Sequence, residues 1–374
     1  MNIAIVSIWF RRGQTYVALQ TREALKKAGH NVHVFARTQM HGGIKMMDTS
    51  DELKVDNFTV YPQYVIHPDD FKKYLTENNI EAVIFLEEQW QAGLAKVCNE
   101  LNIFCANIVV WETFNGTDPQ WKEHYNQFDA LLFQIQSGLD NAQYLSYDNA
   151  HKIPWGIDLN FWHKSEEPVE RKDDAIRFVH SAGWGGMHKR KQTDIVKETF
   201  QELGDVNAQL LIHIQDTVVN NQVTKNVEGN ITTLRGNIER DVLRRFYQCS
   251  DVAIICSKWE GLGLNLLEPQ GVGLPVITTD DPPMNEWITN NYNGFCCDVE
   301  KRVSYKGISI RGSHVSKESL KEKIRIYIDD RSVLKQHSKN ARRNAKRELD
   351  WDKNGKEFVS IVEKLIAKKE EIAS

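Results

Sequence analysis

Short apolar segments alternate along the whole chain with longer amphipathic ones. Segments such as Ile3–Trp9 and Ala82–Leu86 are apolar nearly throughout, as expected of strands that helices cover on both faces of a sheet. A repeated order of strand, helix and strand predicts right-handed crossovers and a parallel sheet. We therefore expect an α/β protein built from Rossmann-like units.

The alternation runs through both halves of the chain. In the first half, strands are expected at Ile3–Trp9, Asn31–Phe35, Ala82–Leu86, Ile103–Val110 and Ala130–Ile135, with helices at Tyr16–Ala28, Pro68–Asn78, Glu88–Leu101 and Ser137–Tyr144. In the second half, strands are expected at Ile176–Ala182, Ala208–His213, Ile231–Leu234, Asp251–Cys256 and Leu274–Thr279. Helices are expected there from Lys191, near Arg240–Cys249, and at Ser316–Asp329, Ser332–Glu348 and Trp351–Lys368.

A change in composition separates the two halves. The segment Ile153–Asp158 (IPWGID) is followed by a polar stretch over residues 164–174. At 374 residues the chain suits two domains of about 150–200 residues each better than a single core. We predict an N-terminal domain over residues 1–155, a C-terminal domain over 156–350 and a terminal helix over 351–374.

Composition narrows the class of protein. The chain is 41% hydrophobic and 26% charged, which is typical of a globular protein. Its net charge of −4 provides no general attraction for nucleic acid. No apolar segment approaches the ~20 residues that span a bilayer, and the apolar start lacks a basic region before it. We expect a cytoplasmic protein that associates with the inner face of a membrane peripherally at most.

The segment from Ser257 to Glu286 carries the clearest chemistry. Glu260 and Glu268 stand eight positions apart, between the strands expected at Asp251–Cys256 and Leu274–Thr279. One acid therefore follows a strand at its carboxyl end, where open α/β sheets bind ligands, and the other lies inside the next helix. A helix that starts near Gly263 favours phosphate at its N-terminus. Acids on either side of a phosphate site fit a nucleotide-sugar.

This segment resembles the donor-binding signature of the retaining family 4 glycosyltransferases, which have the GT-B fold. The resemblance rests on the E-x7-E pattern, on Gly-Leu-Gly after Glu260, on the downstream GLPVITTD and on Glu286. It implies two Rossmann-like domains whose parallel sheets face each other across a cleft, with the terminal helix crossing back to the N-terminal domain. The implied activity is a retaining transfer of a hexose-type sugar from a UDP- or GDP-sugar to a hydroxyl, in glycan or polysaccharide biosynthesis.

The resemblance also assigns roles to residues of the signature. It implies that Glu260 holds sugar hydroxyls and Glu268 the ribose hydroxyls. The residues between the two acids that it places around the donor are Gly261, Leu262, Gly263 and Leu264.

A second element of the resemblance lies in the glycine-rich basic loop over residues 181–194. Lys191, in the sequence KQTD, matches the lysine that contacts the donor diphosphate in the family. The family arginine normally precedes it by about five residues, where this chain has Trp184, Gly185 and Gly186. Arg190 is our candidate to supply that charge, and a solvated basic loop is the alternative.

The remaining assignments rest on single matches. Gly13 follows the first strand, and the turn at Gly236 and Asn237 matches a family turn around the nucleotide base, although a plain turn explains it as well. Family members often have a histidine near the reacting sugar where this chain has Trp111 and Glu112, so these two are expected on the acceptor side. The acceptor is expected to be a glycan, a lipid-linked molecule or a small molecule.

No cofactor or metal is expected, since the chain lacks a DxD-type acidic cluster in a fitting loop. Three alternatives to glycosyl transfer are a sugar-nucleotide epimerase, a phosphorylase of the same fold and a non-catalytic nucleotide-sugar-binding protein. A dinucleotide-dependent oxidoreductase fits poorly, because no G-x-G-x-x-G follows the first strand. The acidic net charge counts against a nucleic-acid partner.

Overall fold

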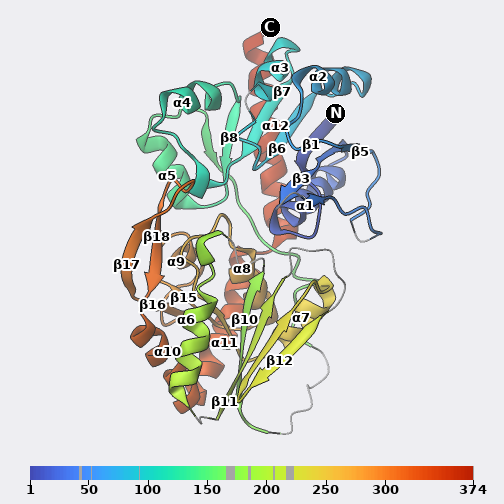
Figure 1. Cartoon of the computed structure of the whole chain (residues 1–374). Coiled ribbons are helices and arrows are strands. Elements are labelled where there is room, and N and C mark those ends of the chain that lie inside the picture. Colours follow the sequence, from blue (N-terminus) through green and yellow to red (C-terminus); the bar gives the residue numbers. More distant parts are fainter. Residues whose placement is uncertain are drawn as a thin grey trace. The chain divides into compact units, whose positions relative to one another are not determined.

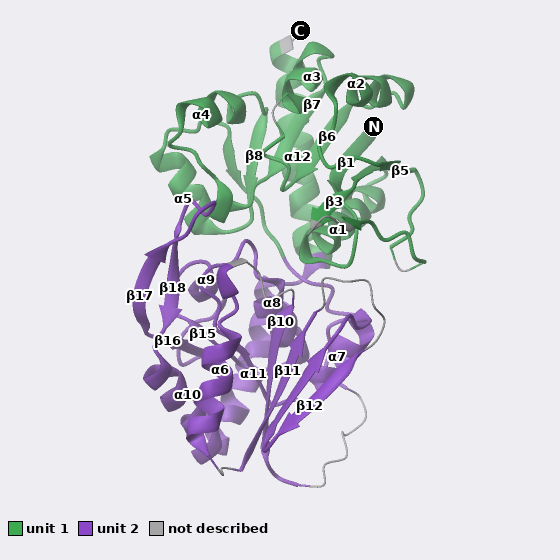
Figure 2. Cartoon of the chain, in the orientation of Figure 1, with its two compact units in different colours: residues 1–155, 352–374 green, residues 156–351 purple. Residues whose placement is uncertain are grey.

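The computed structural model of the chain divides into two compact units (Figure 1, Figure 2). The structure describes residues 1–41, 44–51, 53–91, 93–165, 173–183, 187–204, 207–215 and 223–373. The first unit contains Met1–Trp155 and Asp352–Ser374, and the second contains Gly156–Trp351. The boundary between the second unit and the terminal segment lies after Trp351, one residue later than we predicted, so Trp351 belongs to the second unit.

The first unit is built on a seven-stranded sheet in which every pairing is parallel. Its strands are β1 (Asn2–Ile8), β2 (Asn31–Arg37), β5 (Phe58–Tyr61), β6 (Ala82–Leu86), β7 (Phe104–Ile108), β8 (Ala130–Phe133) and β9 (Ala150–Lys152). The order is β5-β2-β1-β6-β7-β8-β9, so the chain moves outward in one direction from β1 and in the other from β6. The sheet therefore has its topological switch point between β1 and β6.

Helices and one small antiparallel pair complete this unit. They are α1 (Gly13–Lys27), α2 (Pro68–Glu77), α3 (Leu94–Glu100), α4 (Pro119–Tyr125), η1 (Trp111–Thr113), α5 (Gln136–Tyr144), and the strands β3 (Gln39–His41) and β4 (Ile44–Met46). The helix that we predicted over Glu88–Leu101 is wrong in its first half, because α3 begins only at Leu94 after Gly93, whose φ of 94° is left-handed. Residues 87–91 form a loop in which Glu88, Gln89 and Gln91 are buried.

The last helix, α12 (Trp351–Ala373), packs into the first unit although it follows the second in sequence. Asn354 Nδ2 donates to the Trp155 carbonyl at 2.7 Å, and the rings of Trp155 and Phe358 meet edge to face at 6.1 Å. Near the other end of α12, Lys369 Nζ contacts Asp129 at 2.8 Å. These contacts hold both ends of the helix against the unit.

The second unit has a seven-stranded sheet in the order β12-β13-β11-β10-β14-β15-β16, parallel except for the edge strand β12. Its strands are β10 (Ile176–Gly183), β11 (Ala208–Ile214), β12 (Thr224–Glu228), β13 (Ile231–Arg235), β14 (Val252–Ile255), β15 (Val276–Thr279) and β16 (Gly294–Cys297). The chain passes from β10 to β11, then to the edge strand β12 and back to β13, while β14, β15 and β16 follow one another in the other direction. The switch point of this sheet lies between β10 and β14.

The helices of the second unit pack around this sheet, and one hairpin forms a separate two-stranded sheet. They are η2 (Met187–Lys189), α6 (Thr193–Leu203), α7 (Arg240–Gln248), α8 (Leu264–Val272), α9 (Met284–Trp287), α10 (Lys317–Asp329) and α11 (Arg331–Glu348), and the hairpin is β17 (Val299–Ser304) with β18 (Arg311–Val315). The helix that we expected from Lys191 begins two residues later at Thr193, since Gln192 has a left-handed φ of 51°. Apolar side chains of β10, β11, β14 and α6, among them Phe178, Phe200 and Ile254, form the buried core.

Candidate functional site

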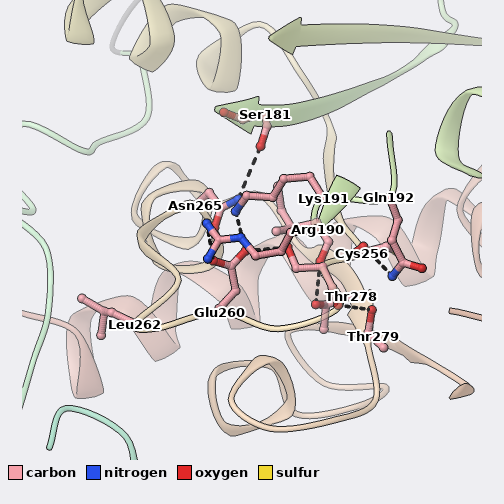
Figure 3. A network of polar contacts seen from close by, with 12 residues as sticks. Ser181, Arg190, Lys191, Gln192, Cys256, Glu260, Leu262, Asn265, Thr278 and Thr279 are labelled. Atoms are coloured by element: carbon pink, nitrogen blue, oxygen red, sulfur yellow. Dashed lines mark hydrogen bonds and ion pairs between the residues drawn. The ribbon is translucent and has the colours of Figure 1, made fainter. Parts of the chain in front are cut away.

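Two loops meet at the switch point of the second sheet. One follows β10 and contains Arg190 and Lys191, and the other follows β14 and contains Glu260. The backbone N–H of Lys258 donates to the Arg190 carbonyl at 2.8 Å, which joins the two loops directly. Because ligands of open α/β sheets bind at this point, the charged side chains of these loops form the candidate site (Figure 3).

Glu260 is buried, with 3% of its surface exposed, and its charge is compensated by its neighbours. Lys191 Nζ and Ser257 Oγ donate to one carboxylate oxygen, and an Arg190 nitrogen lies 3.8 Å from the other. Burial by itself raises the pKa of Glu260, but Lys191 and Arg190 more than offset this, so its pKa lies below the ordinary value. The carboxylate is therefore ionised and held in one orientation.

Lys191 is the central charge of the site. Its side chain is 8% exposed, and its positive charge lowers the pKa of both Glu260 and Glu268. It also helps burial to lower the pKa of His180 to about 4, so that this neighbouring imidazole is neutral at pH 7. Arg190 is only 23% exposed and lies on the same carboxylate. The structure thus brings together the two cations and the first acid of the sequence prediction.

The helix α8 begins where the sequence predicted, immediately after Gly263. Gly263 has a left-handed φ of 82°, and a Cβ placed there would lie 2.8 Å from Leu266 Cδ1. A residue other than glycine would therefore strain both the backbone and the packing. Leu262 is buried and its carbonyl accepts from Trp287 Nε1 at 2.9 Å, while Gly261 and Leu264 are half-buried. The unpaired N–H groups of this helix start lie next to Glu260 in the chain.

Glu268 lies in the second turn of α8 and is 7% exposed. Among the described residues, no side chain or backbone N–H donates a hydrogen bond to its carboxylate. Burial raises its pKa to about 7, although the charges of Arg240 and Lys191 act in the opposite direction. A carboxylate in this state has a strong tendency to accept hydrogen bonds from a ligand.

The other predicted residues belong to other elements of the chain. Gly236 and Asn237 follow β13, and Gly236 has a positive φ of 141° and accepts a bond from the ring of His213 at 3.0 Å. Gly13, Trp111 and Glu112 belong to the first unit. Gly13 is the first residue of α1, and both Trp111 and Glu112 are buried in η1.

The position of the missing family arginine lies outside the described residues. Trp184, Gly185 and Gly186 occupy it, so the structure describes only Arg190 of the alternatives that we named.

Three residues of the site were not predicted from the sequence. Ser257 contacts Glu260, and Arg240, the first residue of α7, lies near enough to Glu268 to lower its pKa. The side chain of Gln192 donates to the Cys256 carbonyl at 2.9 Å and to the Ser313 carbonyl at 3.2 Å, joining both loops to strand β18. A glutamine between a lysine and a helix start carries no signal of this role in the sequence.

No group of three or more His, Cys, Asp or Glu within the described ranges is arranged to hold a metal ion. None of the helices in the same part of the chain is both long and apolar enough to cross a membrane.

Comparison with known sequences identifies a domain in the second unit. Residues 187–347 match the family described as glycosyl transferases group 1. The chain is also 31% identical over 112 residues, or 29% of its length, to the uncharacterized glycosyltransferase 335 of Sulfolobus islandicus rod-shaped virus 1. The matched segment spans about a third of the length of that relative (33%).

Comparison with solved structures identifies the fold. The sucrose-phosphate synthase of Thermosynechococcus elongatus superposes with a TM-score of 0.74 at 14% identity, over 98% of this chain and 100% of the other. Anabaena HepE in complex with UDP and glucose superposes with a TM-score of 0.72 at 12% identity, over 97% of this chain and 100% of HepE. The lipopolysaccharide glycosyltransferase WaaG gives 0.65 at 15% identity over 94% and 98%. The fold is thus the two-domain, Rossmann-like fold of the GT-B glycosyltransferases.

Proposed function

We propose that the chain transfers a hexose-type sugar from a nucleoside-diphosphate sugar to a hydroxyl acceptor in glycan or polysaccharide biosynthesis, with retention of the anomeric configuration. The observation that carries the proposal is the cluster at the switch point of the second sheet, where Lys191 and Arg190 meet Glu260 beside the start of α8. The group 1 glycosyl transferase domain at residues 187–347 supports it. A solved relative of this fold, HepE, binds UDP-glucose.

The proposed chemistry follows from the charges of the cluster. The bond between the anomeric carbon and the diphosphate breaks, and the acceptor oxygen forms a new bond to the same face of that carbon. The acceptor proton passes to the departing phosphate oxygen, so no side-chain base is required. Lys191, Arg190 and the N–H groups at the start of α8 stabilise the negative charge of the leaving group. The proposed reaction needs neither a cofactor nor a metal.

The two acids divide the donor between them in this proposal. Glu260 accepts from hydroxyls of the transferred sugar, and Glu268 accepts from the ribose. The remaining donor contacts are assigned to Gly261, Leu262, Gly263, Leu264, Gly236 and Asn237 in the second unit and to Gly13 in the first. Trp111 and Glu112 are assigned to the acceptor.

An assay with a panel of UDP- and GDP-sugars tests the proposal. We expect release of UDP or GDP with at least one donor, and a product whose anomeric proton coupling in NMR shows the same configuration as the donor. An inverted product contradicts retention. An epimerised nucleotide-sugar without transfer identifies the epimerase alternative, and binding without turnover of any donor identifies the non-catalytic one.

Replacing Glu260 with glutamine is expected to separate nucleotide binding from turnover. Its proposed partner is the sugar, so the Kd for free UDP or GDP should change by less than about threefold, since a side chain that does not contact the bound nucleotide contributes little to its affinity. Turnover should fall by about tenfold or more, because a preorganised charge is lost at the reacting sugar. If the variant remains folded but no longer binds free nucleotide, the roles of Glu260 and Glu268 are reversed.

Nucleotide affinity is expected to rise with pH around neutrality. The pKa of Glu268 is about 7 because of burial, and its ionised form, present above that pKa, is the better acceptor for ribose hydroxyls. Between pH 8 and pH 6 the ionised fraction falls to about a tenth, so Kd should rise by about tenfold. Glu268→Gln should retain only the titration of the nucleotide phosphates. Equal pH profiles of the variant and the wild type rule out this role of Glu268.

A further inference from the structure

A stacked pair of aromatic rings, with Tyr64 exposed and Trp90 half-buried, lies at the carboxyl edge of the sheet in the first unit. The rings of Tyr64 and Trp90 stack with their centroids 4.9 Å apart and their planes 21° apart. Tyr64 follows β5, and Trp90 follows β6. Tyr64 is 38% exposed and Val65 beside it is 57% exposed. Aromatic rings that remain in water in a fixed arrangement are typical of binding surfaces.

A buried ion pair beneath the rings fixes their position. Arg37, at the end of β2, donates from Nε to both carboxylate oxygens of Glu88 at 2.8 Å, and both residues are almost fully buried. The guanidinium carbon lies 5.0 Å from the Tyr64 ring centroid and 4.9 Å from that of Trp90. The cation therefore contacts both rings, while its charge is compensated by Glu88.

A glutamine joins the two loops that carry the rings. The Gln91 side chain accepts from the Ile66 backbone N–H at 2.8 Å and donates to Glu88 at 2.6 Å. On the other side of β6, the side chain of Gln14 donates to the Leu86 carbonyl at 2.6 Å. The loop after β5 and the loop after β6 are thus tied together by buried polar groups, which makes the aromatic pair rigid before any ligand binds.

The loop that carries Trp90 leaves the sheet at its switch point, between β1 and β6. This is the position at which an open α/β sheet binds its ligand, and it is the counterpart in the first unit of the Lys191 and Glu260 site in the second. The two sites differ in charge. Lys191 and Arg190 offer positive charge to a diphosphate, whereas the charge of Arg37 is already matched by Glu88.

From these observations we infer that Tyr64 and Trp90 form a saccharide-binding site, on which an uncharged pyranose ring stacks its C–H face. A ring of this kind fits an aromatic surface without a free cation, since it is apolar on one face and carries hydroxyls at its edge. In the proposed function this site holds a sugar unit of the acceptor, which makes the acceptor a glycan. The role of this saccharide as the acceptor rests on the proposed function. The binding of a saccharide does not, because the site lies within the first unit.

Fluorine NMR on the full chain labelled with 5-fluorotryptophan tests the inference without any turnover. The Trp90 signal is assigned by its absence in Trp90→Phe. Mono- and disaccharides of glucose, galactose, mannose and N-acetylglucosamine are then titrated without nucleotide. We expect at least one of them to shift the Trp90 signal saturably and to leave in place the signal of Trp155, which is buried against α12. In Tyr64→Ala the Kd for that saccharide should rise by about tenfold, since one face of the stack is lost.

Tyr144→Ala is the matched control, because Tyr144 is 87% exposed on α5 of the same unit. It should leave the saccharide Kd unchanged, and thermal unfolding establishes that both tyrosine variants are folded. A Trp90 signal that no saccharide moves, or a Kd that is the same in Tyr64→Ala and wild type, overturns the inference. Calorimetry with UDP and GDP on the same protein separates the two proposals. Nucleotide binding without saccharide binding refutes the saccharide site alone, and the converse refutes the proposed function alone.

Discussion

Replacing Lys191 with alanine is expected to lower turnover at saturating donor by about a hundredfold or more, the effect of losing one preorganised stabilising group at a leaving oxygen. Lys191 is the buried cation closest to Glu260, and its charge reaches Glu268 as well. Lys191 Nζ lies closer to the carboxylate than Arg190 Nη2, which is 3.8 Å from it. The Arg190→Ala variant should accordingly lose less turnover than Lys191→Ala.

The chain provides a matched control for this change. Lys189 stands two positions earlier, with a side chain that is 83% exposed and paired with Asp194 at the surface. Lys189→Ala should keep nearly normal turnover, since an exposed ion pair contributes little. Removing Lys191 leaves Glu260 buried with a weaker partner, which destabilises the fold, so turnover must be compared below the melting temperature of each variant. Nearly normal turnover of folded Lys191→Ala would show that the diphosphate is stabilised without Lys191, by backbone N–H groups or other cations.

Replacing Glu268 with alanine is expected to weaken the binding of free nucleotide and of nucleotide-sugar to the same extent. Each loses a charged acceptor for two ribose hydroxyls, an effect of about 1.5–3 kcal/mol, or roughly 10- to 150-fold in Kd. The expectation rests on the burial of Glu268 and on its pKa of about 7, which leave its carboxylate available to a ligand. Calorimetry with UDP or GDP measures the change.

Glu300→Ala serves as the control, because Glu300 is exposed on β17 of the same unit. It should bind nucleotide as the wild type does. A selective loss of nucleotide-sugar affinity in Glu268→Ala, with free nucleotide unaffected, would place Glu268 at the sugar and not at the ribose. Unchanged affinity for both ligands would remove it from the donor site.

The sequence predicted the local framework of the site because that framework depends on short-range patterns. The continuous apolar run before Cys256 defines β14, and the glycine at position 263 defines the start of α8. With both ends fixed, the eight-residue spacing places Glu260 in the loop and Glu268 in the second turn of the helix. Lys191 lies in the loop before α6, which begins two residues later. It was singled out by its resemblance to a family motif.

The contacts between distant loops could not be predicted in this way. Gln192 bonds to residues 64 and 121 positions away, and nothing in its neighbours indicates these partners. The same holds for Arg37 and Glu88, which are 51 residues apart. Glu88 was instead expected in a helix, because an apolar-periodic pattern continues through it. The buried bond to Arg37 holds Glu88 in the loop, and the helix begins only beyond Gly93.

We propose above all that the cluster of Lys191, Glu260 and Glu268 holds the donor and that its nucleoside diphosphate binds there. Calorimetric titration of the full chain with UDP and with GDP tests this most directly. We predict saturable binding of one nucleotide per chain for at least one of the two, with a Kd that rises by at least about tenfold in Glu268→Ala and stays within about threefold in Glu260→Gln. Absence of binding to both nucleotides, or binding that neither Lys191→Ala nor Glu268→Ala weakens, would contradict the account.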